Sequence, residues 1–218
     1  MHVRRIACAL AGLSMIAIAL LPLVRTLAAE YLLSVHVVRQ LALTLGAPLF
    51  FLCALPKRES LSVRIPWWLC WASGMAGIAI WYVPRVFAAW GQNDATLLVS
   101  FALGVLFWWP LFTPWEALRL SPAPAGIAYL FCATIFASLL GIVLTFIRPE
   151  AYAHYLNPKD SLGILVALET RFNLARENDQ ETAGLTMWIG SCTFFLSAVM
   201  WMFYRLYTSK EKTVDKLR

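Results

Sequence analysis

Long runs of hydrophobic residues, separated by short polar connections, form the main pattern of this chain. An α-helix rises 1.5 Å per residue, so about 20 apolar residues cross the roughly 30 Å hydrocarbon core of a bilayer. Six runs are close to that length or longer, and they cover about residues 6–24, 31–55, 66–84, 95–112, 125–147 and 182–207. The pattern predicts an all-α polytopic membrane bundle of about six transmembrane helices, with a seventh possible. We expect one domain over residues 1–208 and a charged tail over 209–218.

Two segments leave alternatives open. The first run follows Arg4-Arg5, and small residues at 26–29 offer a cleavage site, as in a signal peptide. Its length of about 19 residues suits a spanning helix, so we expect it to be retained. The polar connection 150–181 carries apolar residues at roughly helical spacing between Leu162 and Phe172. This pattern indicates a short amphipathic helix on the membrane surface, and an ordered loop with apolar anchors is the alternative.

Composition agrees with a membrane protein. Hydrophobic residues make up 61% of the 218 positions and charged residues 14%, whereas soluble domains carry about 25% charged residues. A net charge of +6 would suggest a nucleic-acid partner in a soluble chain, but here the charge must be interpreted by its location. We expect no nucleic acid. Five cysteines lie in or beside apolar runs without CxxC spacing, so we expect inert packing thiols and no disulfide framework.

The distribution of basic residues predicts the orientation. With six spans, one side of the membrane would hold both termini and eleven lysines and arginines: Arg4, Arg5, Lys57, Arg58, Arg64, Arg119, Arg205, Lys210, Lys212, Lys216 and Arg218. The other side would hold six: Arg25, Arg85, Arg148, Lys159, Arg171 and Arg176. Because cytoplasmic loops are enriched in Lys and Arg, we expect cytoplasmic termini in a bacterial inner membrane. The stretch from Asp179 to Trp188 would then face the outer, periplasmic side.

Several polar side chains would share the outer leaflet in that topology. His36 would lie about 9 Å below the outer surface, with Arg39 and Gln40 on the same helical face. Tyr82 and Met187 would lie at a similar depth, and His154 in the outer loop. Ionisable residues inside a membrane commonly mark functional sites. The alternative is structural, in which Arg39 pairs with Glu30 or Asp179 and His36 only hydrogen-bonds a neighbouring helix. Met187 alone would then be a packing residue.

The chemistry of these side chains favours a soft ion over hydrolysis. Imidazole and thioether ligands from His36 and Met187 would suit Cu(I), or the edge of a haem. The sequence has no HExxH pair, no Gly-rich phosphate loop and no Ser/His/Asp arrangement. We therefore expect no enzymatic activity.

Four motifs, in order, resemble those of the CtaG-type cytochrome c oxidase assembly factors. They are Ser34-Val35-His36 with Ala47-Pro48-Leu49, Trp81-Tyr82-Val83-Pro84, Leu106-Phe107-Trp108-Trp109-Pro110, and Asp179-Gln180 leading to Ala183-Gly184-Leu185-Thr186-Met187-Trp188. The last motif is the most specific. The chain departs from the family pattern where Gln40 and Tyr82 replace histidines, and no histidine occurs in residues 96–100. Amide and phenol groups are poor ligands for Cu(I).

The resemblance implies an accessory or assembly factor of a respiratory haem–copper oxidase, with oxidase subunits and lipid as partners. In one form of this hypothesis, His36 and Met187 hold Cu(I), while Asp179 caps the last helix and keeps Met187 and Trp188 in register. In the other form, the ligands are lost and the protein is a structural subunit or scaffold; the missing histidines favour this form. A haem-binding electron carrier and a small transporter are the alternatives from other classes.

Overall fold

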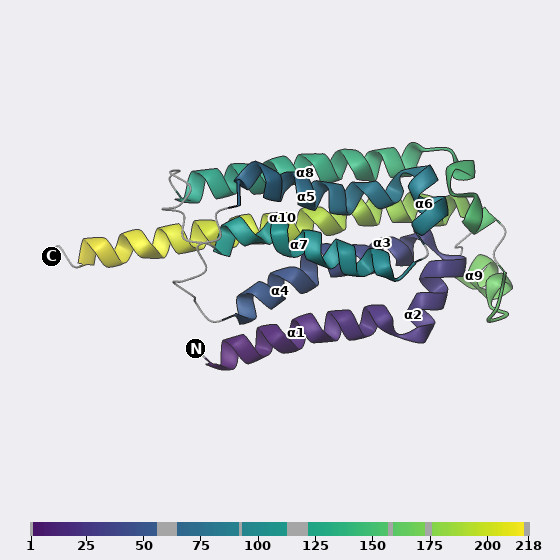
Figure 1. Ribbon diagram of the computed structural model, residues 1–218, viewed down its shortest axis with the longest axis horizontal. Coiled ribbons are helices and arrows are strands. Elements are labelled where there is room, and N and C mark those ends of the chain that lie inside the picture. Colours follow the sequence, from purple (N-terminus) through teal and green to yellow (C-terminus); the bar gives the residue numbers. More distant parts are fainter. Residues whose placement is uncertain are drawn as a thin grey trace.

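The computed structural model describes residues 2–55, 65–91, 93–112, 122–156, 159–172 and 176–215. Its long helices lie side by side along one axis (Figure 1). They include α1 (His2–Leu20), α7 (Ala95–Phe112), α8 (Pro122–Phe146) and α10 (Arg176–Asp215). The chain enters and leaves the bundle at the same end, as an even number of crossings requires (Figure 1). We call that end the inner end, and the cytoplasm there remains a prediction from the charge distribution.

Five helices of the described chain are long and apolar enough to cross a membrane. They are Val3–Leu20, Leu33–Ala54, Ala95–Phe112, Ala125–Phe146 and Asn178–Tyr204. Each coincides with one of the predicted runs, which confirms the all-α membrane bundle.

The third predicted run, 66–84, does not form one long helix. Its α-helix α5 (Trp67–Ala79) has 13 residues and gives way to a 3-10 turn, η3 (Ile80–Tyr82). Val83 is extended because the proline that follows disfavours helical geometry at the residue before it. Pro84 then begins the short helix α6 (Pro84–Trp90). α5 packs within the bundle against α7 and α8. With 13 residues it is too short to cross a membrane as one helix.

The second predicted run, 31–55, is interrupted by one π-helical turn and begins where another ends. It divides into α3 (Leu33–Leu41), the π-helical turn η2 (Ala42–Gly46) and α4 (Ala47–Ala54). A second π-helical turn, η1 (Leu27–Tyr31), follows the five-residue helix α2 (Pro22–Thr26). π-helical turns interrupt the regular hydrogen-bond ladder and are frequent near functional sites.

The polar segment after α8 forms the outer end of the bundle. It contains a 3-10 segment, η5 (Pro149–Leu156), and the helix α9 (Leu165–Phe172). Asp160 caps α9, since its Oδ1 accepts the backbone N–H groups of Ile164 and Leu165 at 3.0 and 3.2 Å. The predicted short helix is therefore confirmed, and its position on the membrane surface stays a prediction. Val166 and Phe172 are 71% and 61% exposed, so the helix presents apolar side chains outward.

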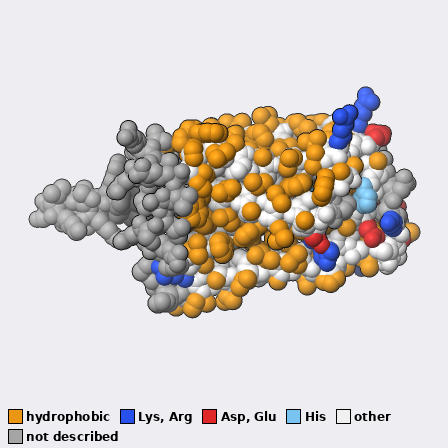
Figure 2. Space-filling model, in the orientation of Figure 1, with side chains coloured by type: hydrophobic (Ala, Val, Ile, Leu, Met, Phe, Trp, Pro, Cys, Tyr) orange, Lys and Arg blue, Asp and Glu red, His pale blue; other side chains and the backbone are white. Residues whose placement is uncertain are grey.

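Apolar side chains also cover the middle of the bundle. On the face drawn in Figure 2, hydrophobic side chains cover the middle of the bundle, and the acidic and histidine side chains with most of the basic ones gather at the outer end. On α8, the exposed residues Leu139, Val143 and Phe146 form one stripe. Such a band is what a lipid environment requires of a spanning bundle.

Candidate functional site

Asp179 caps a helix that is distant in the sequence. Its carboxylate accepts the backbone N–H groups of Leu33 at 2.6 Å and Ser34 at 3.3 Å, and also the Ser34 hydroxyl. These donors stand at the start of α3, where the N-cap residue Leu32 supplies no side-chain acceptor. The carboxylate therefore satisfies orphan donors and lies at the positive end of the α3 dipole.

The sequence-based expectation that Asp179 caps the last helix was wrong. Helix α10 begins at Arg176 instead of near residue 182, so Asp179 already lies in its first turn. From this position its side chain reaches across to α3, with which α10 packs. The capping chemistry was predicted correctly, but the helix that receives the cap was not.

Gln180 caps the C-terminal end of another helix, α8. Its Nε2 donates to the backbone oxygens of Leu144 at 3.2 Å and Ile147 at 2.5 Å. The carbonyls in the last turn of α8 have no partners within their own helix, and the amide supplies them. Neighbouring residues on α10 thus bind the start of α3 and the end of α8. We call Asp179 and Gln180 the double cap.

Two glycines let α8 and α10 approach closely just below the double cap. A Cβ atom on Gly184 would lie 2.0 Å from Thr145 Oγ1 and 2.8 Å from the Gly141 oxygen. A Cβ atom on Gly141 would lie 2.9 Å from the backbone nitrogen of Trp188. Small residues at a helix crossing allow this approach in membranes. The glycine of the motif thus serves the packing that keeps the double cap in position.

Met187 and Trp188 point in different directions from the same turn. Met187 is fully buried in the core, whereas Trp188 is 43% exposed at the lipid-facing surface. The sequence singled out both residues as possible site members. The structure gives Met187 the surroundings of a packing residue and Trp188 those of an outward-facing one.

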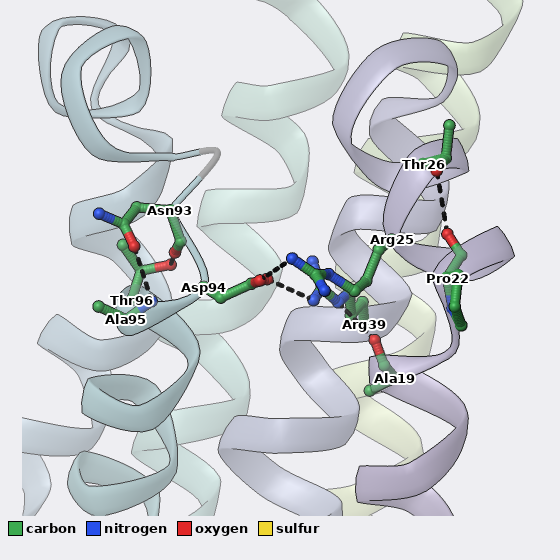
Figure 3. Close-up of polar contacts among 9 residues, drawn as sticks. All are labelled: Ala19, Pro22, Arg25, Thr26, Arg39, Asn93, Asp94, Ala95 and Thr96. Carbon is green, nitrogen blue, oxygen red and sulfur yellow. Dashed lines mark hydrogen bonds and ion pairs between the residues drawn. The ribbon is translucent and has the colours of Figure 1, made fainter. Parts of the chain in front are cut away.

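Arg39 is buried and forms two polar contacts at the outer end (Figure 3). Its Nε donates to the Ala19 oxygen at the end of α1, at 2.7 Å, and its Nη2 donates to Asp94 Oδ1 at 2.8 Å. Asp94 also forms an ion pair with Arg25 of α2. The predicted partners of Arg39, Glu30 and Asp179, are therefore wrong.

Asp94 was missed because it lies in a connection, one residue before α7. Its neighbour Asn93 accepts the Ala95 N–H at 2.9 Å, which orders the turn that precedes the helix. The predicted topology placed this connection at the outer surface, not far above the predicted depth of Arg39. A search for acids at the outer ends of the runs would have found Asp94 as a candidate partner.

His36 lies in an aromatic environment that is closed to solvent. It is 4% exposed, with the rings of Tyr82 and Phe87 at centroid distances of 6.2 and 5.2 Å. Its Nε2 atom has no hydrogen-bond partner, and neither does the Tyr82 hydroxyl. Gln40 interacts with the His36 ring and donates to the Gly77 oxygen at 3.2 Å. The structure thus places both Tyr82 and Gln40 beside His36, whereas the sequence predicted only a shared helical face for Gln40 and a similar depth for Tyr82.

The two predicted copper ligands make different contacts. His36 faces Tyr82 and Phe87, while Met187 is buried in the apolar core on α10. α3 approaches α10 through Leu41, whose Cδ1 would lie 3.1 Å from a Cβ atom on Gly190. Within the described part of the chain, no three or more His, Cys, Asp or Glu side chains group as a metal site. Copper binding at His36 and Met187 stays a prediction.

Two tyrosines of η5 form hydrogen bonds at the outer end, next to the aromatic surroundings of His36. Tyr152 donates to the Tyr82 oxygen at 2.7 Å, and Tyr155 donates to the Ala28 oxygen of η1 at 2.6 Å. Both rings also contact Phe87. Burial raises the pKa of Tyr152 to about 12, so its hydroxyl keeps the proton that it donates. His154 lies in the outer segment as expected, where its Nε2 hydrogen-bonds the Ala29 oxygen at 2.6 Å.

A second set of unpaired polar atoms lies deeper, between η2 and α7. Thr44 and Ser100 are fully buried, and their hydroxyl oxygens have no partner. The helices meet here because Gly104 lacks a side chain, since a Cβ atom there would lie 2.0 Å from the Thr44 oxygen. The π-helical turn also frees the Leu45 oxygen, which accepts the Trp108 indole N–H at 2.9 Å. We call His36, Tyr82, Thr44 and Ser100 the unpaired group.

The fold and the outer-end geometry define a polytopic membrane protein whose polar residues mainly join helices. The family model of the cytochrome c oxidase caa3 assembly factors (Caa3_CtaG) matches residues 1–209. The chain belongs to this family, as its motifs indicated. No curated protein and no solved structure matches it significantly.

Proposed function

We propose that this chain is a structural accessory factor in the assembly of a haem–copper oxidase, with no catalytic role of its own. The observation that carries the proposal is the double cap. Asp179 and Gln180 belong to the most specific motif of the chain, and their side chains are used in hydrogen bonds that hold α3, α8 and α10 together. A motif that holds helices together supports a structural role, in which the rigid bundle binds oxidase subunits.

The outer end offers the surface that such docking needs. Trp90 of α6 is 58% exposed, and Val166 and Phe172 of α9 are exposed to a similar or greater degree. Tryptophan and other large apolar side chains are frequent anchors in protein interfaces. We expect the oxidase subunits to contact this end, in the bacterial inner membrane and on its periplasmic side.

Gentle detergent extraction followed by affinity purification tests the docking role. Oxidase subunits should co-purify with the wild type, and Val166→Asp should reduce their amount because a charge would replace an apolar contact. Thr170→Asp adds the same charge to another exposed position of α9 and is the matched control. Purification of the wild type as an isolated protein, without oxidase subunits, would contradict the proposal.

Copper delivery from the outer half is the second candidate, and one observation favours it. The buried Nε2 of His36 has no partner, as expected of a nitrogen that waits for a ligand. One imidazole does not complete a Cu(I) site, so a further ligand would have to come from Met187 or from a partner protein. Copper content after loading with Cu(I) should then fall in His36→Ala relative to the wild type. Equal copper in both proteins would rule this candidate out.

A further inference from the structure

Two cysteines from distant parts of the sequence meet at the inner end of the bundle. Helices α1 and α4 run in opposite directions and pack closely (Figure 1). At their crossing, a Cβ atom on Gly12 would lie 3.4 Å from Phe50 Cβ and 3.5 Å from the Ala47 oxygen. Cys8 lies one turn before Gly12, and Cys53 lies about one turn after Phe50. In antiparallel helices these steps lead to the same level.

The contacts of the thiols agree with this register. The Cys8 thiol and the Arg4 guanidinium both lie close enough to act on the partly buried Cys53 thiol. Arg4 precedes Cys8 by four residues, so the two share a face of α1. Both cysteines are free and only half-buried. The pair is therefore a preformed dithiol beside a cation, close to the inner end of the bundle.

We propose that Cys8 and Cys53 form a two-coordinate thiolate site for Cu(I). Thiolates are soft ligands that select Cu(I) over harder ions. Zinc prefers four ligands, and the described residues provide no group of three or more metal-ligating side chains here or elsewhere. The basic residues of the inner side predict a cytoplasmic location, where thiols remain reduced and a disulfide is disfavoured.

The binding step is balanced without a redox partner. Each thiol releases its proton to solvent, two Cu–S bonds form, and the copper stays Cu(I). Two thiolates and one Cu(I) ion carry a net charge of −1. The Arg4 guanidinium acts on Cys53 and offsets part of the cost that burial imposes on this anion.

The site can be tested with the purified full-length chain, loaded with Cu(I) under ascorbate and challenged with a Cu(I) chelator. Stoichiometric copper should survive in the wild type, and most should be lost in both Cys8→Ser and Cys53→Ser. Cys132→Ser is the matched control because Cys132 is exposed on α8, away from the α1–α4 crossing. X-ray absorption of the loaded wild type should show copper bound by two sulfur atoms.

Two outcomes would overturn the proposal. In one, the Cys8→Ser, Cys53→Ser double variant keeps the copper of the wild type. In the other, the wild type holds no copper and mass spectrometry finds these cysteines joined as a disulfide. The result is also separable from the outer candidate, since His36→Ala should retain the copper held at the inner site. Oxidase co-purification is measured independently, so loss of the thiol site does not decide the docking role.

Discussion

The double cap and the unpaired group belong to one bundle but use their polar atoms in opposite ways. Asp179 accepts three hydrogen bonds, and Gln180 donates two. His36 is only two residues from Ser34, a partner of Asp179, and its Nε2 atom has no partner. Ser100, on α7, is completely buried and equally unpaired.

The difference shows which polar residues hold this fold together. In hydrocarbon, an unsatisfied polar group costs several kcal/mol, because no water can replace the missing partner. Groups in the double cap therefore stabilise the bundle, whereas groups in the unpaired set weaken it. Their retention inside the protein makes them candidates for contact with something that the chain alone does not contain, such as water or a ligand.

Removal of the Asp179 carboxylate should have the largest effect. Asp179→Ala leaves the Leu33 and Ser34 N–H groups without acceptors, and each buried unsatisfied group costs about 1–3 kcal/mol. We expect a loss of about 2–6 kcal/mol in the free energy of unfolding, measured by SDS titration with circular dichroism. Glu181→Ala, which removes an exposed carboxylate on the next residue, is the control. Equal stability of the two variants would show that Asp179 does not act as a cap.

A side chain at Gly184 should separate α8 from α10 and weaken the double cap indirectly. The added methyl of Gly184→Ala would meet the backbone of Thr145 and Gly141, so the helices must move apart. Overpacking of this kind costs about 1–3 kcal/mol. Gly190→Ala is the comparison, because its Cβ would meet only the flexible end of Leu41. The same unfolding titration should rank Gly184→Ala clearly below Gly190→Ala, and the reverse order would contradict the close crossing.

Loss of the Gln180 amide should have a smaller effect. Gln180→Met keeps the length of the side chain but removes the donors to the Leu144 and Ile147 oxygens. We expect a cost of about 1–2 kcal/mol, since these carbonyls lie near the outer boundary where water can partly replace the amide. Hydrogen exchange should quicken in the last turn of α8 and leave its middle unchanged. If the last turn of α8 exchanges at the same rate in Gln180→Met and in the wild type, Gln180 does not cap this helix.

The sequence predicted these regions unequally well, for physical reasons. Hydrophobic periodicity is a local property, so the five spanning helices and the amphipathic segment could be predicted from it. The partner of Asp179 could not, because Leu33 is 146 positions away and its N–H group is present in every possible arrangement. Arg39 was recognised as needing a counter-ion, but several acids lay at the outer side. The choice of Asp94 depends on how α7 packs against η2 and α4, which continue the chain from α3.

Pro84, the first residue of α6, shows on a smaller scale that local sequence patterns do not predict contacts between helices. Pro84 was included as the last residue of the third run, although a proline at that point restricts the residue before it. The helix α5 ends at Ala79, and η3 brings Tyr82 beside His36. The sequence predicted a similar depth for the two residues, but neither their contact nor the 3-10 turn that produces it.

Two identical substitutions, one of which has the smallest expected effect, give the most direct test of the comparison. Ser34→Ala removes a hydroxyl that donates to Asp179, and hydrogen bonds to charged groups contribute about 1.5–3 kcal/mol. Ser100→Ala removes a hydroxyl that has no partner, so we expect a change below about 0.5 kcal/mol, or a slight stabilisation. Both positions are buried and both changes have the same size, so the difference in unfolding free energy isolates the hydrogen bond. If Ser100→Ala proves as costly as Ser34→Ala, Ser100 has a bound partner in the membrane, and the unpaired group is part of an occupied site.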